Sequence, residues 1–431
     1  MTFGFQDALT FLLEKLPAYH RLGAPALRPG LENIKTLCDW LGNPQEKYQT
    51  IHVAGTNGKG STSHMLAALL QSAGYKTGLL TSPHLISYRE RIKINGREID
   101  ESYVVEFVQK FHKAQIEGDF SFFEISTALA FQYFADCKVD IAVIETGLGG
   151  TFDSTNIIKP ILSVITNIDY DHKHLLGNSL AEIAEQKAGI IKAERPVVVG
   201  RRNKETDSVF SNVAEAKRSP IIFSSDVCDL ILTEEGARVL FLNTDTQLFF
   251  KPQLKGHYQY ENFQTVGAAF LALKEQFRLT TSHLLEALTH VVELTGLRGR
   301  YETLSNRPHI VCDVAHNPDG LEAVFEQAIR ETVGMLHIVV GVVADKKVAE
   351  IAPLFPQSAK YYITQPSVER AMEASKLAES LSSRKLKIQT ITFTVAEALS
   401  NALDNADADD LILITGSTFV VADAIRFLEG I

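Results

Sequence analysis

The chain has 431 residues, of which 45% are hydrophobic and 22% charged, which is the composition of a globular protein. A chain of this length is too long for one hydrophobic core, so we expect two or three domains. The formal net charge of -10 argues against a polymeric nucleic acid as partner, because proteins that bind nucleic acids normally carry a basic surplus. No apolar run approaches the roughly 18 residues of a membrane span, the N-terminus lacks the features of a signal peptide, and the four scattered cysteines form no metal-type pair. We therefore expect a cytoplasmic protein that does not bind membranes.

Short apolar runs alternate with amphipathic segments from about Tyr48 onward. This alternation predicts a parallel sheet with helices on both faces. After Gly200 the pattern weakens, and alternating pieces within 221–253 predict antiparallel hairpins. The expected strands are 51–54, 77–82, 139–146, 161–168 and 196–200, and the expected helices are 61–73 and 262–277.

The strand–helix alternation restarts after the segment 294–301, LTGLRGRY, in which two glycines and two arginines interrupt a helical pattern. The restart predicts a second α/β domain. We place the boundary so that residues 1–299 form a P-loop-containing domain with a mostly parallel sheet and residues 300–431 a smaller, Rossmann-like α/β domain. Strands are expected at 309–315, 335–343, 359–366, 386–393 and 409–417.

The segment GTNGKGS at 55–61, called the phosphate loop below, lies between a predicted strand and a predicted helix. Gly55 and Gly58 permit backbone angles that are closed to other residues, and such a turn can aim N–H groups at phosphate oxygens. Lys59 would reach the β- and γ-phosphates, Gly60 would allow a close approach to the nucleotide, and Ser61 or Thr62 would start the helix. The alternative is a glycine-rich turn with a solvated lysine. The residues predicted to bind nucleotide in this loop are Thr56, Asn57, Gly58, Lys59, Gly60 and Ser61.

Two further side chains follow predicted strands. Glu145 closes the strand VDIAVI, and His172 lies just after ILSVITNI, so both belong at the carboxyl edge of the parallel sheet, where ligand clefts form in such folds. A neighbouring carboxylate, Asp171, could orient the histidine ring. The alternatives are an edge-capping glutamate and a solvated loop histidine.

These motifs together resemble the folylpolyglutamate synthases and dihydrofolate synthases, which belong with the Mur ligases among ATP-dependent amide ligases. The resemblance starts at GTNGKGS and continues in the family's order over nearly the whole chain. The other matching strings are SPHLISYRERIKING (82–96), FFEISTALAF (122–131), ETGLGGTFDSTN (145–156), DYDHKHLLG (169–177), QKAGIIK (186–192), DVAHNP (313–318) and ITGSTFVV (414–421).

The resemblance implies an ATP- and Mg²⁺-dependent carboxylate–amine ligase that adds L-glutamate to dihydropteroate, to tetrahydrofolate or to both through an acyl phosphate. Residues 1–299 would then bind ATP and folate, and residues 300–431 would be the C-terminal ligase domain. Alternatives are folylpolyglutamate synthase activity alone, a Mur-type cell-wall ligase, and a P-loop switch protein that uses nucleotide only to change shape. We expect small-molecule substrates, including reduced folates, and a monomer.

The resemblance also assigns roles to individual residues. Lys187 would be carboxylated by CO₂, and the catalytic residues would be Lys59, His172, Lys187 and His316. The implied magnesium ligands are Ser82, Glu145 and His172. Further nucleotide-binding residues would be Asn262, Arg300 and Asp313. The implied dihydropteroate site consists of Ser121, Phe123, Phe152, Asp153 and Ser154.

Ordinary caps, turns and core packing are the alternative for most of these positions. The chain also departs from the family in three strings. It has GGTFDSTN where the family often has GGRLDATN, QKAG where EKAG is common, and RGR where PGR is common. Thr151 in place of arginine puts the contacts to the pterin in doubt. The segment 294–301 is the predicted hinge between the two domains.

Overall fold

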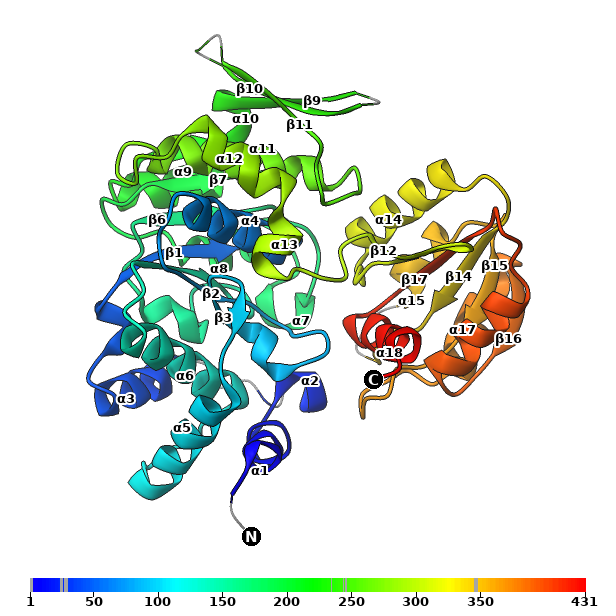
Figure 1. The fold of residues 1–431 in the computed structure, drawn as a ribbon, viewed down its shortest axis with the longest axis horizontal. Coiled ribbons are helices and arrows are strands. Elements are labelled where there is room, and N and C mark those ends of the chain that lie inside the picture. The colour runs from blue at the N-terminus through cyan, green and yellow to red at the C-terminus, as the bar shows by residue number, and fades with distance from the viewer. Residues whose placement is uncertain are drawn as a thin grey trace. The chain divides into compact units, whose positions relative to one another are not determined.

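The computed structural model describes residues 3–23, 26, 30–233, 235–242, 244, 246–344 and 348–431 (Figure 1). The chain divides into two compact units. The N-terminal unit comprises Met1–Tyr19, Ala24–Gln253 and Gln259–Leu297, and the C-terminal unit comprises His20–Gly23, Leu254–Tyr258 and Arg298–Ile431. No helix in the described part of the chain combines the length and apolar character that crossing a membrane requires.

The N-terminal unit is built on an eight-stranded sheet in the order β4-β3-β2-β5-β1-β6-β7-β8. All neighbours from β2 to β8 are parallel, whereas β3 and β4 form an antiparallel edge. The parallel sheet is confirmed; β8, which extends it, lies in the segment for which only hairpins were predicted. The strands are β1 (Gln49–Ala54), β2 (Thr77–Leu80), β3 (Ile92–Ile94), β4 (Arg97–Glu98), β5 (Ile141–Glu145), β6 (Leu162–Ile165), β7 (Val197–Val199) and β8 (Ile221–Phe223).

Helices cover both faces of this sheet, as predicted. The helices α4, α11 and α12 lie on one side, and α6 and α8 lie on the other (Figure 1). The longer helices are α3 (Glu32–Trp40), α4 (Lys59–Ser72), α5 (Glu101–Ala114), α6 (Phe122–Asp136), α8 (Leu180–Ala188), α9 (Asp207–Ala216), α11 (Gln259–Leu273) and α12 (Thr281–Thr289). The shorter ones are α1 (Phe5–Thr10), η1 (Phe11–Lys15), α2 (Tyr19–Leu22), η3 (Pro44–Glu46), η4 (Tyr88–Arg91), η5 (Ser154–Ile157), α7 (Lys173–Leu176), α10 (Ser224–Val227) and α13 (Val291–Thr295).

The predicted antiparallel hairpins form a separate three-stranded sheet in the order β11-β10-β9. Both neighbouring pairs are antiparallel. The strands are β9 (Cys228–Thr233), β10 (Gly236–Phe241) and β11 (Gln247–Phe250).

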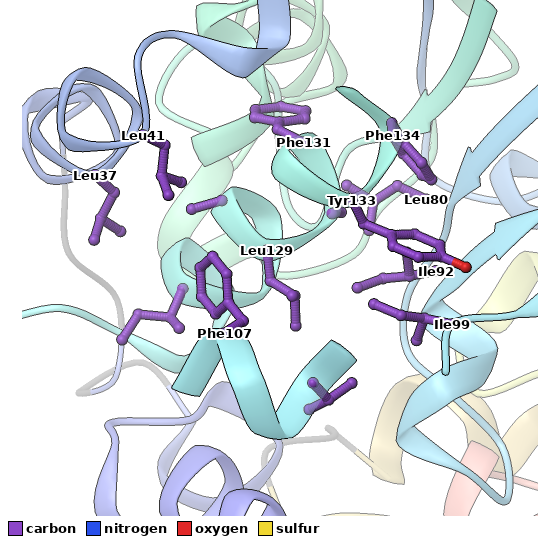
Figure 2. Close-up of a cluster of buried hydrophobic side chains, with 14 of the residues drawn as sticks. Leu37, Leu41, Leu80, Ile92, Ile99, Phe107, Leu129, Phe131, Tyr133 and Phe134 are labelled. Atoms are coloured by element: carbon purple, nitrogen blue, oxygen red, sulfur yellow. The ribbon is translucent and has the colours of Figure 1, made fainter. Parts of the chain in front are cut away.

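A large apolar cluster fixes α6 against one face and edge of the N-terminal sheet. Figure 2 shows Tyr133 and Phe134 of α6 beside Leu80 and Ile92 of the sheet, with Leu129 of α6 next to Phe107 of α5. Burying a phenylalanine side chain stabilises the fold by roughly 1.5–3 kcal/mol, so this cluster holds α6 rigidly. The N-terminus of α6, where the predicted site residues Ser121 and Phe123 lie, is positioned by that packing.

The C-terminal unit contains a six-stranded sheet in the order β12-β13-β17-β14-β15-β16. Each of the five strands predicted for it is present, and these five run parallel to one another. The antiparallel edge strand β12 was not predicted. The strands are β12 (Glu302–Asn306), β13 (His309–Cys312), β14 (Leu336–Val340), β15 (Lys360–Ile363), β16 (Lys387–Ile391) and β17 (Leu411–Thr415). The helices are α14 (Pro318–Glu331), α15 (Val348–Ile351), η6 (Ala352–Leu354), α16 (Ala374–Leu381), η7 (Ser382–Arg384), α17 (Val395–Asp404) and α18 (Thr418–Glu429).

A buried polar network joins the amino ends of β14 and β17 to a tyrosine of β15 in this second sheet. His337 Nε2 lies 3.0 Å from Asp410 Oδ2, and His337 Nδ1 lies 2.9 Å from the hydroxyl of Tyr362. Burial lowers the pKa of His337, so the neutral ring donates to the carboxylate and accepts from the phenol. Asp410 Oδ1 accepts in addition from the backbone N–H of Met335 at 2.7 Å. Both ring nitrogens of His337 and both carboxylate oxygens of Asp410 therefore have hydrogen-bond partners within the C-terminal unit.

The segment before the break between the units is anchored to the N-terminal unit. Lys93 Nζ donates to the carbonyls of Thr295 and Gly296 at 2.9 and 3.1 Å, and His64 Nδ1 lies 2.7 Å from Thr295 Oγ1. Gly296 and Gly299 have φ angles of +65° and +69°, which favour glycine. The hinge at 294–301 stays a prediction, and because these contacts anchor the segment through Gly296, it would lie after that residue.

Candidate active site

The phosphate loop turns sharply between β1 and α4. Gly55 and Gly58 have φ angles of +151° and +80°, as predicted. A Cβ atom on Gly55 would lie 1.8 Å from Thr166 Oγ1, and one on Gly58 would lie 2.1 Å from Asn262 Oδ1. Both glycines are therefore required by space as well as by conformation. The prediction that Ser61 or Thr62 starts the helix is wrong, because left-handed Gly58 is already the N-cap and α4 begins at Lys59.

The two residues that follow β6, Thr166 and Asn167, hold the phosphate loop by hydrogen bonds. The N–H of Thr56 donates to the carbonyl of Asn167 at 2.9 Å, and the N–H of Asn57 donates to Asn167 Oδ1 at 2.8 Å. Thr166 Oγ1 donates to the carbonyl of Asn57 at 2.5 Å. Neither Thr166 nor Asn167 was predicted; polar residues directly after the strand ILSVI were the available signal. Because the first N–H groups of a helix have no intrahelical acceptor, the start of α4, where Gly60 is buried, is the natural phosphate-binding position.

Two lysines from separate elements converge on one carbonyl of this loop. Lys59 Nζ donates to the carbonyls of Gly55 and Thr56, both at 3.1 Å, and Lys187 Nζ donates to the carbonyl of Gly55 at 2.7 Å. Burial, and after it the charge of Lys59, lowers the pKa of Lys187 to about 7. A large fraction of Lys187 is therefore neutral near pH 7, and a neutral amine is the form that reacts with CO₂.

The predicted metal ligands Ser82 and Glu145 lie together at the carboxyl ends of β2 and β5. The buried carboxylate of Glu145 accepts from the N–H of Ser82 at 3.2 Å. No group of three or more His, Cys, Asp or Glu side chains that could hold a metal occurs among the described residues. Magnesium in nucleotide enzymes is usually held by one or two carboxylates together with phosphate and water, so a carboxylate beside a serine hydroxyl fits such an ion.

The third predicted ligand, His172, sits at the start of α7 with a left-handed φ of +48°. Its Nδ1 lies 2.9 Å from the hydroxyl of Tyr19, and its Nε2 lies 3.5 Å from Asp171 Oδ2. Asp171 is thus placed beside the ring as expected. Tyr19 was missed because it is 153 positions away in the sequence. Binding a metal would require His172 to exchange one of these two polar neighbours.

At the predicted dihydropteroate site, the N-terminus of α6 meets the loop 147–156. Ser121 caps α6 through Glu124. The ring of Phe123 lies against Gly147 so closely that a Cβ atom there would be 2.6 Å from Phe123 Cζ. Its neighbour Phe122 is buried in the core. Of the two phenylalanines, only Phe123 is placed at the loop.

Within the loop 147–156, Asp153 and Phe152 point in opposite directions. Asp153 is buried and accepts from Leu148 N–H at 2.8 Å and from Thr155 N–H at 3.0 Å, and it caps η5, which begins at Ser154. Burial raises its pKa, in opposition to these hydrogen bonds. Phe152, by contrast, is 59% exposed. The carboxylate of Asp153 therefore stabilises the conformation of the loop through hydrogen bonds within it, and the ring of Phe152 is exposed to solvent.

Thr151, at the position where the family often has arginine, packs against the end of α8. Its N–H donates to the carbonyl of Gln186 at 2.8 Å. A Cβ atom on Gly189 would lie 2.2 Å from Thr151 Oγ1, and one on Gly150 would lie 3.0 Å from Lys187 Cα. The loop 147–156 and the segment that carries Lys187 are consequently in direct contact.

The predicted residues of the C-terminal unit gather at the carboxyl end of β13. Asp313 is buried; its Oδ2 accepts from Tyr301 N–H at 2.8 Å and from the hydroxyl of Tyr258, and its Oδ1 accepts from Ala315 N–H at 2.8 Å. Burial raises the pKa of Asp313, and the nearby charge of Arg300 opposes that rise. Tyr258 had no sequence signal, because it belongs to a five-residue piece far from β13 in the sequence.

His316 and Asn317 follow in the same turn. His316 Nδ1 lies 2.9 Å from the carbonyl of Val314, and Asn317 caps α14 by accepting from Gly320 N–H at 2.9 Å. Arg300 Nη1 donates to the carbonyl of Gly299 at 3.3 Å. In its own unit, each predicted residue therefore lies at a sheet's carboxyl edge or on a segment packed against it.

Asn262 joins α11 to the phosphate loop. Its Nδ2 donates to Gln259 Oε1 at 2.8 Å, and its Oδ1 lies 3.5 Å from Thr62 Oγ1 and close behind Gly58. The N-terminal unit thus brings Asn262 and Lys187 to the phosphate loop. A cradle of helix N-terminus and lysine beside a buried carboxylate is able to bind a nucleoside triphosphate and a divalent cation.

Two family models of Mur ligase domains match most of the chain. Residues 53–270 match the family model described as Mur ligase middle domain, and residues 299–418 match the one described as Mur ligase, glutamate ligase domain. The folylpolyglutamate synthase of Lacticaseibacillus casei is 34% identical over 408 residues, which are 91% of this chain and 92% of that protein. A probable bifunctional folylpolyglutamate synthase/dihydropteroate synthase of Haloferax volcanii is 32% identical over 432 residues; the match covers 97% of this chain but only 50% of that protein.

Solved structures of similar proteins share the whole fold. Escherichia coli FolC in complex with DHPP and ADP superposes with a TM-score of 0.86 at 27% identity, covering 99% of this chain and 98% of that one. The bifunctional folylpolyglutamate synthase/dihydrofolate synthase of Yersinia pestis, complexed with AMPPNP and a Mn ion, gives a TM-score of 0.85 at 26% identity with the same coverage.

Proposed function

The chain belongs to the folylpolyglutamate synthase/dihydrofolate synthase family of Mur-type, ATP-dependent ligases, and we propose that it adds L-glutamate both to dihydropteroate and to tetrahydrofolate or related reduced folates. The observation that carries the proposal is the phosphate loop, at which the N-terminus of α4 and two lysines, Lys59 and Lys187, meet beside the carboxyl edge that holds Glu145. The match of residues 299–418 to a glutamate ligase domain supports glutamate as the incoming amine.

The proposed reaction joins two anions, so positive charge is its main requirement. An oxygen of the acceptor carboxylate would bond to the γ-phosphorus of ATP as the bond to ADP breaks, which gives an acyl phosphate. The amine of glutamate would then form the amide bond, lose a proton and expel phosphate. Lys59 and the N-terminal N–H groups of α4 would hold the β- and γ-phosphates in both steps.

Glu145 and Ser82 are the proposed holders of a magnesium ion, with His172 as a third ligand. When bound, the ion would neutralise charge between the phosphates and the carboxylate. The manganese in the Yersinia pestis enzyme complex supports a divalent cation. Asp171 and Tyr19, the polar neighbours of His172, would set the orientation of its ring.

We propose that Lys187 is carboxylated on Nζ. The lowered pKa supplies neutral amine, and loss of a proton from nitrogen as the N–C bond to CO₂ forms leaves an anionic carbamate. Mass spectrometry of fresh enzyme, prepared in bicarbonate without acid, is expected to show one added CO₂ at Lys187. A fully active enzyme whose Lys187 is unmodified under those conditions would exclude the role.

The remaining roles follow the same assignment. In the C-terminal unit we propose Arg300, Asp313 and His316 for the nucleotide or the incoming amino acid, and in the N-terminal unit Asn262 for the nucleotide. The proposed dihydropteroate-binding residues are Ser121, Phe123, Phe152, Asp153 and Ser154. DHPP in the Escherichia coli FolC complex supports a pterin ligand for this fold. Because Asp153 is satisfied within its own loop, its contribution would be to shape that loop.

We also propose that the enzyme is a cytoplasmic monomer. A reducing compartment agrees with its cysteines, since disulfides form mainly in oxidising ones. The thiols, all free, are those of Cys38, Cys137, Cys228 and Cys312.

One experiment tests the activity directly. The purified protein is incubated with ATP, Mg²⁺ and L-glutamate, with dihydropteroate and tetrahydrofolate supplied in turn, and the products are weighed by mass spectrometry. We expect each acceptor to gain glutamate residues and ADP to form only when both glutamate and an acceptor are present. Products from tetrahydrofolate alone would reduce the proposal to folylpolyglutamate synthase activity. ATP hydrolysis that ignores both substrates would favour a nucleotide switch.

A further inference from the structure

The loop 147–156 is held by two basic side chains from different elements, the buried His52 and the half-buried Lys192. His52 lies in β1 with no exposed surface, and its Nε2 is 2.8 Å from Thr155 Oγ1. Lys192 follows α8, and its Nζ donates to the backbone carbonyl of Asn156 at 2.9 Å and to Asn156 Oδ1 at 2.8 Å. These two side chains support the loop from beneath.

The direction of the hydrogen bonds at His52 follows from the chemistry of its partners. The hydroxyl of Thr155 has one proton, which it donates to Asp153 Oδ1 at 2.5 Å. Its oxygen must then accept from His52, so the imidazole carries its proton on Nε2. Burial lowers the pKa of His52 to about 3, and the ring stays neutral at physiological pH. A directed chain therefore runs from His52 through Thr155 to the carboxylate of Asp153.

A second chain starts at Lys192 and ends on the other side of the loop. Asn156, which Lys192 holds, donates through Nδ2 to the carbonyl of Thr151 at 3.1 Å and to that of Gly189 at 3.3 Å. Thr151 and Asp153 flank Phe152. The exposed ring of Phe152 thus lies between two residues, and each of them is fixed by its own hydrogen-bond chain, one to buried His52 and the other to half-buried Lys192.

His52 is not the side chain that stability alone would select at this position. Its Nδ1 is buried and has no hydrogen-bond partner within the described ranges of the chain. A buried polar atom without a partner destabilises a fold, and an apolar side chain in the interior of β1 would avoid that cost. The benefit of His52 must therefore lie in the hydrogen bond that it gives to Thr155.

We propose that His52 and Lys192 are positioning residues for the flat aromatic substrate: through Thr155 and Asn156 they fix the loop 147–156 so that Phe152 is held ready to contact the pterin ring. Holding the loop in its binding conformation lowers the entropic cost of binding. The inference rests on the proposed function, because it takes a pterin as the ligand. It adds two residues, neither of which needs to touch the substrate.

Substrate-specific kinetics tests the proposal. His52→Leu removes the donor and adds no polar group. We expect it to raise KM for dihydropteroate about tenfold while KM for ATP and kcat stay within about twofold, and to leave Tm unchanged or higher because the unpaired Nδ1 is gone. Lys192→Met should raise the same KM. His52→Gln and Lys192→Arg, which keep donors, should restore it in part.

Two controls separate positioning from general loss of structure. His337→Leu also removes a buried histidine, but from the amino edge of the other sheet; it should lower Tm and leave both KM values unchanged. If His52 acts through Phe152, the effects of His52→Leu and Phe152→Ala on KM should be less than additive in the double variant. Full additivity would overturn the proposed route.

Binding measured without turnover distinguishes the possible failures. Titration of dihydropteroate, followed by pterin fluorescence, should give a Kd that is about tenfold higher in His52→Leu than in the wild type. Equal Kd values would overturn this inference and leave the proposed function standing. A wild-type protein that does not bind dihydropteroate at all would overturn both. A lower Tm with unchanged KM values would show that His52 has only a structural role, which also refutes the proposal.

Discussion

The carboxyl edge of the N-terminal sheet and the amino edge of the C-terminal sheet both carry buried ionisable side chains, but they solve different problems. At the first, Lys59 and Lys187 crowd onto one carbonyl, and the charge of Lys59 helps to lower the pKa of Lys187. At the second, His337 lies between Asp410 and Tyr362, and both of its ring nitrogens have a partner of the right kind.

The difference shows how a site prepared for a ligand can be distinguished from a structural network. Two amines placed close together, one of them buried, disfavour a second positive charge until an anion joins them, whereas His337, Asp410 and Tyr362 already satisfy one another. The position of the two lysines also indicates a ligand site, since ligands in open α/β sheets bind at the carboxyl ends of the strands. The first network is therefore expected to control activity and the second to control stability.

The largest expected effect is the loss of activity in Lys59→Met. The variant removes the ammonium that we propose for the β- and γ-phosphates, and kcat should fall by about 10³-fold. Glutamate-dependent ADP release measures the effect. Tm should change little, because Lys187 still donates to Gly55. A variant that retains activity but melts early would remove the contrast between the two edges.

The next effect is expected at the amino edge of the C-terminal sheet. His337→Leu leaves Asp410 without its ring partner and Tyr362 without its acceptor, so the C-terminal unit should lose about 3 kcal/mol of unfolding free energy. Urea unfolding measures the loss. The fraction of enzyme that remains folded should turn over at the wild-type rate; a reduced kcat in the folded enzyme would give this network a catalytic part.

Gly60→Val tests whether the second residue of α4 must lack a side chain to leave space for the nucleotide. Gly60 is buried and has no left-handed φ angle, so the reason for glycine would be space near the phosphates. We expect kcat to fall about 10²-fold with an unchanged circular dichroism spectrum. Wild-type kinetics in this variant would refute the idea that the loop must be narrow there.

The smallest of these effects is the change of stability with pH that the lowered pKa of Lys187 causes, and its direction can be predicted. In the folded protein the pKa of Lys187 is lowered to about 7 from its ordinary value of 10.5, so between pH 7 and 9 the unfolded state binds more protons and stability rises with pH. In CO₂-free buffer the wild type should gain about 2 kcal/mol over that range relative to Lys187→Met. Parallel stability curves for the two proteins would contradict the lowered pKa. Bicarbonate should suppress the gain if Lys187 becomes carboxylated.

The sequence was most informative where neighbours in the chain determine structure. The buried parallel strands were predicted because continuous apolar runs between glycine-rich turns can form little else. The strand β12 and the hairpin of β3 and β4 escaped because they are short and partly polar edge strands. The start of α4 was misplaced by two residues because the left-handed angle of Gly58 cannot be read from a glycine in a glycine-rich loop.

The candidate site divides in the same way. Motifs located Lys59, Glu145 and Asp313, which lie at the end of a strand or shortly after one. The residues that hold them in place come from distant segments, such as Tyr19 beside His172 and Tyr258 beside Asp313. Packing of the whole fold creates those pairs, and a single sequence contains no local pattern for them.

The carbonyl of Gly55 receives hydrogen bonds from two amines, and this has a consequence for how nucleotide enters and leaves. When a triphosphate attracts the ammonium of Lys59, the oxygen keeps its second donor, Lys187. On the proposed role of Lys59, the turn would lose the hydrogen bonds of this lysine to Gly55 and Thr56 and keep that of Lys187, so exchange of ADP for ATP would require only the Lys59 side chain to move.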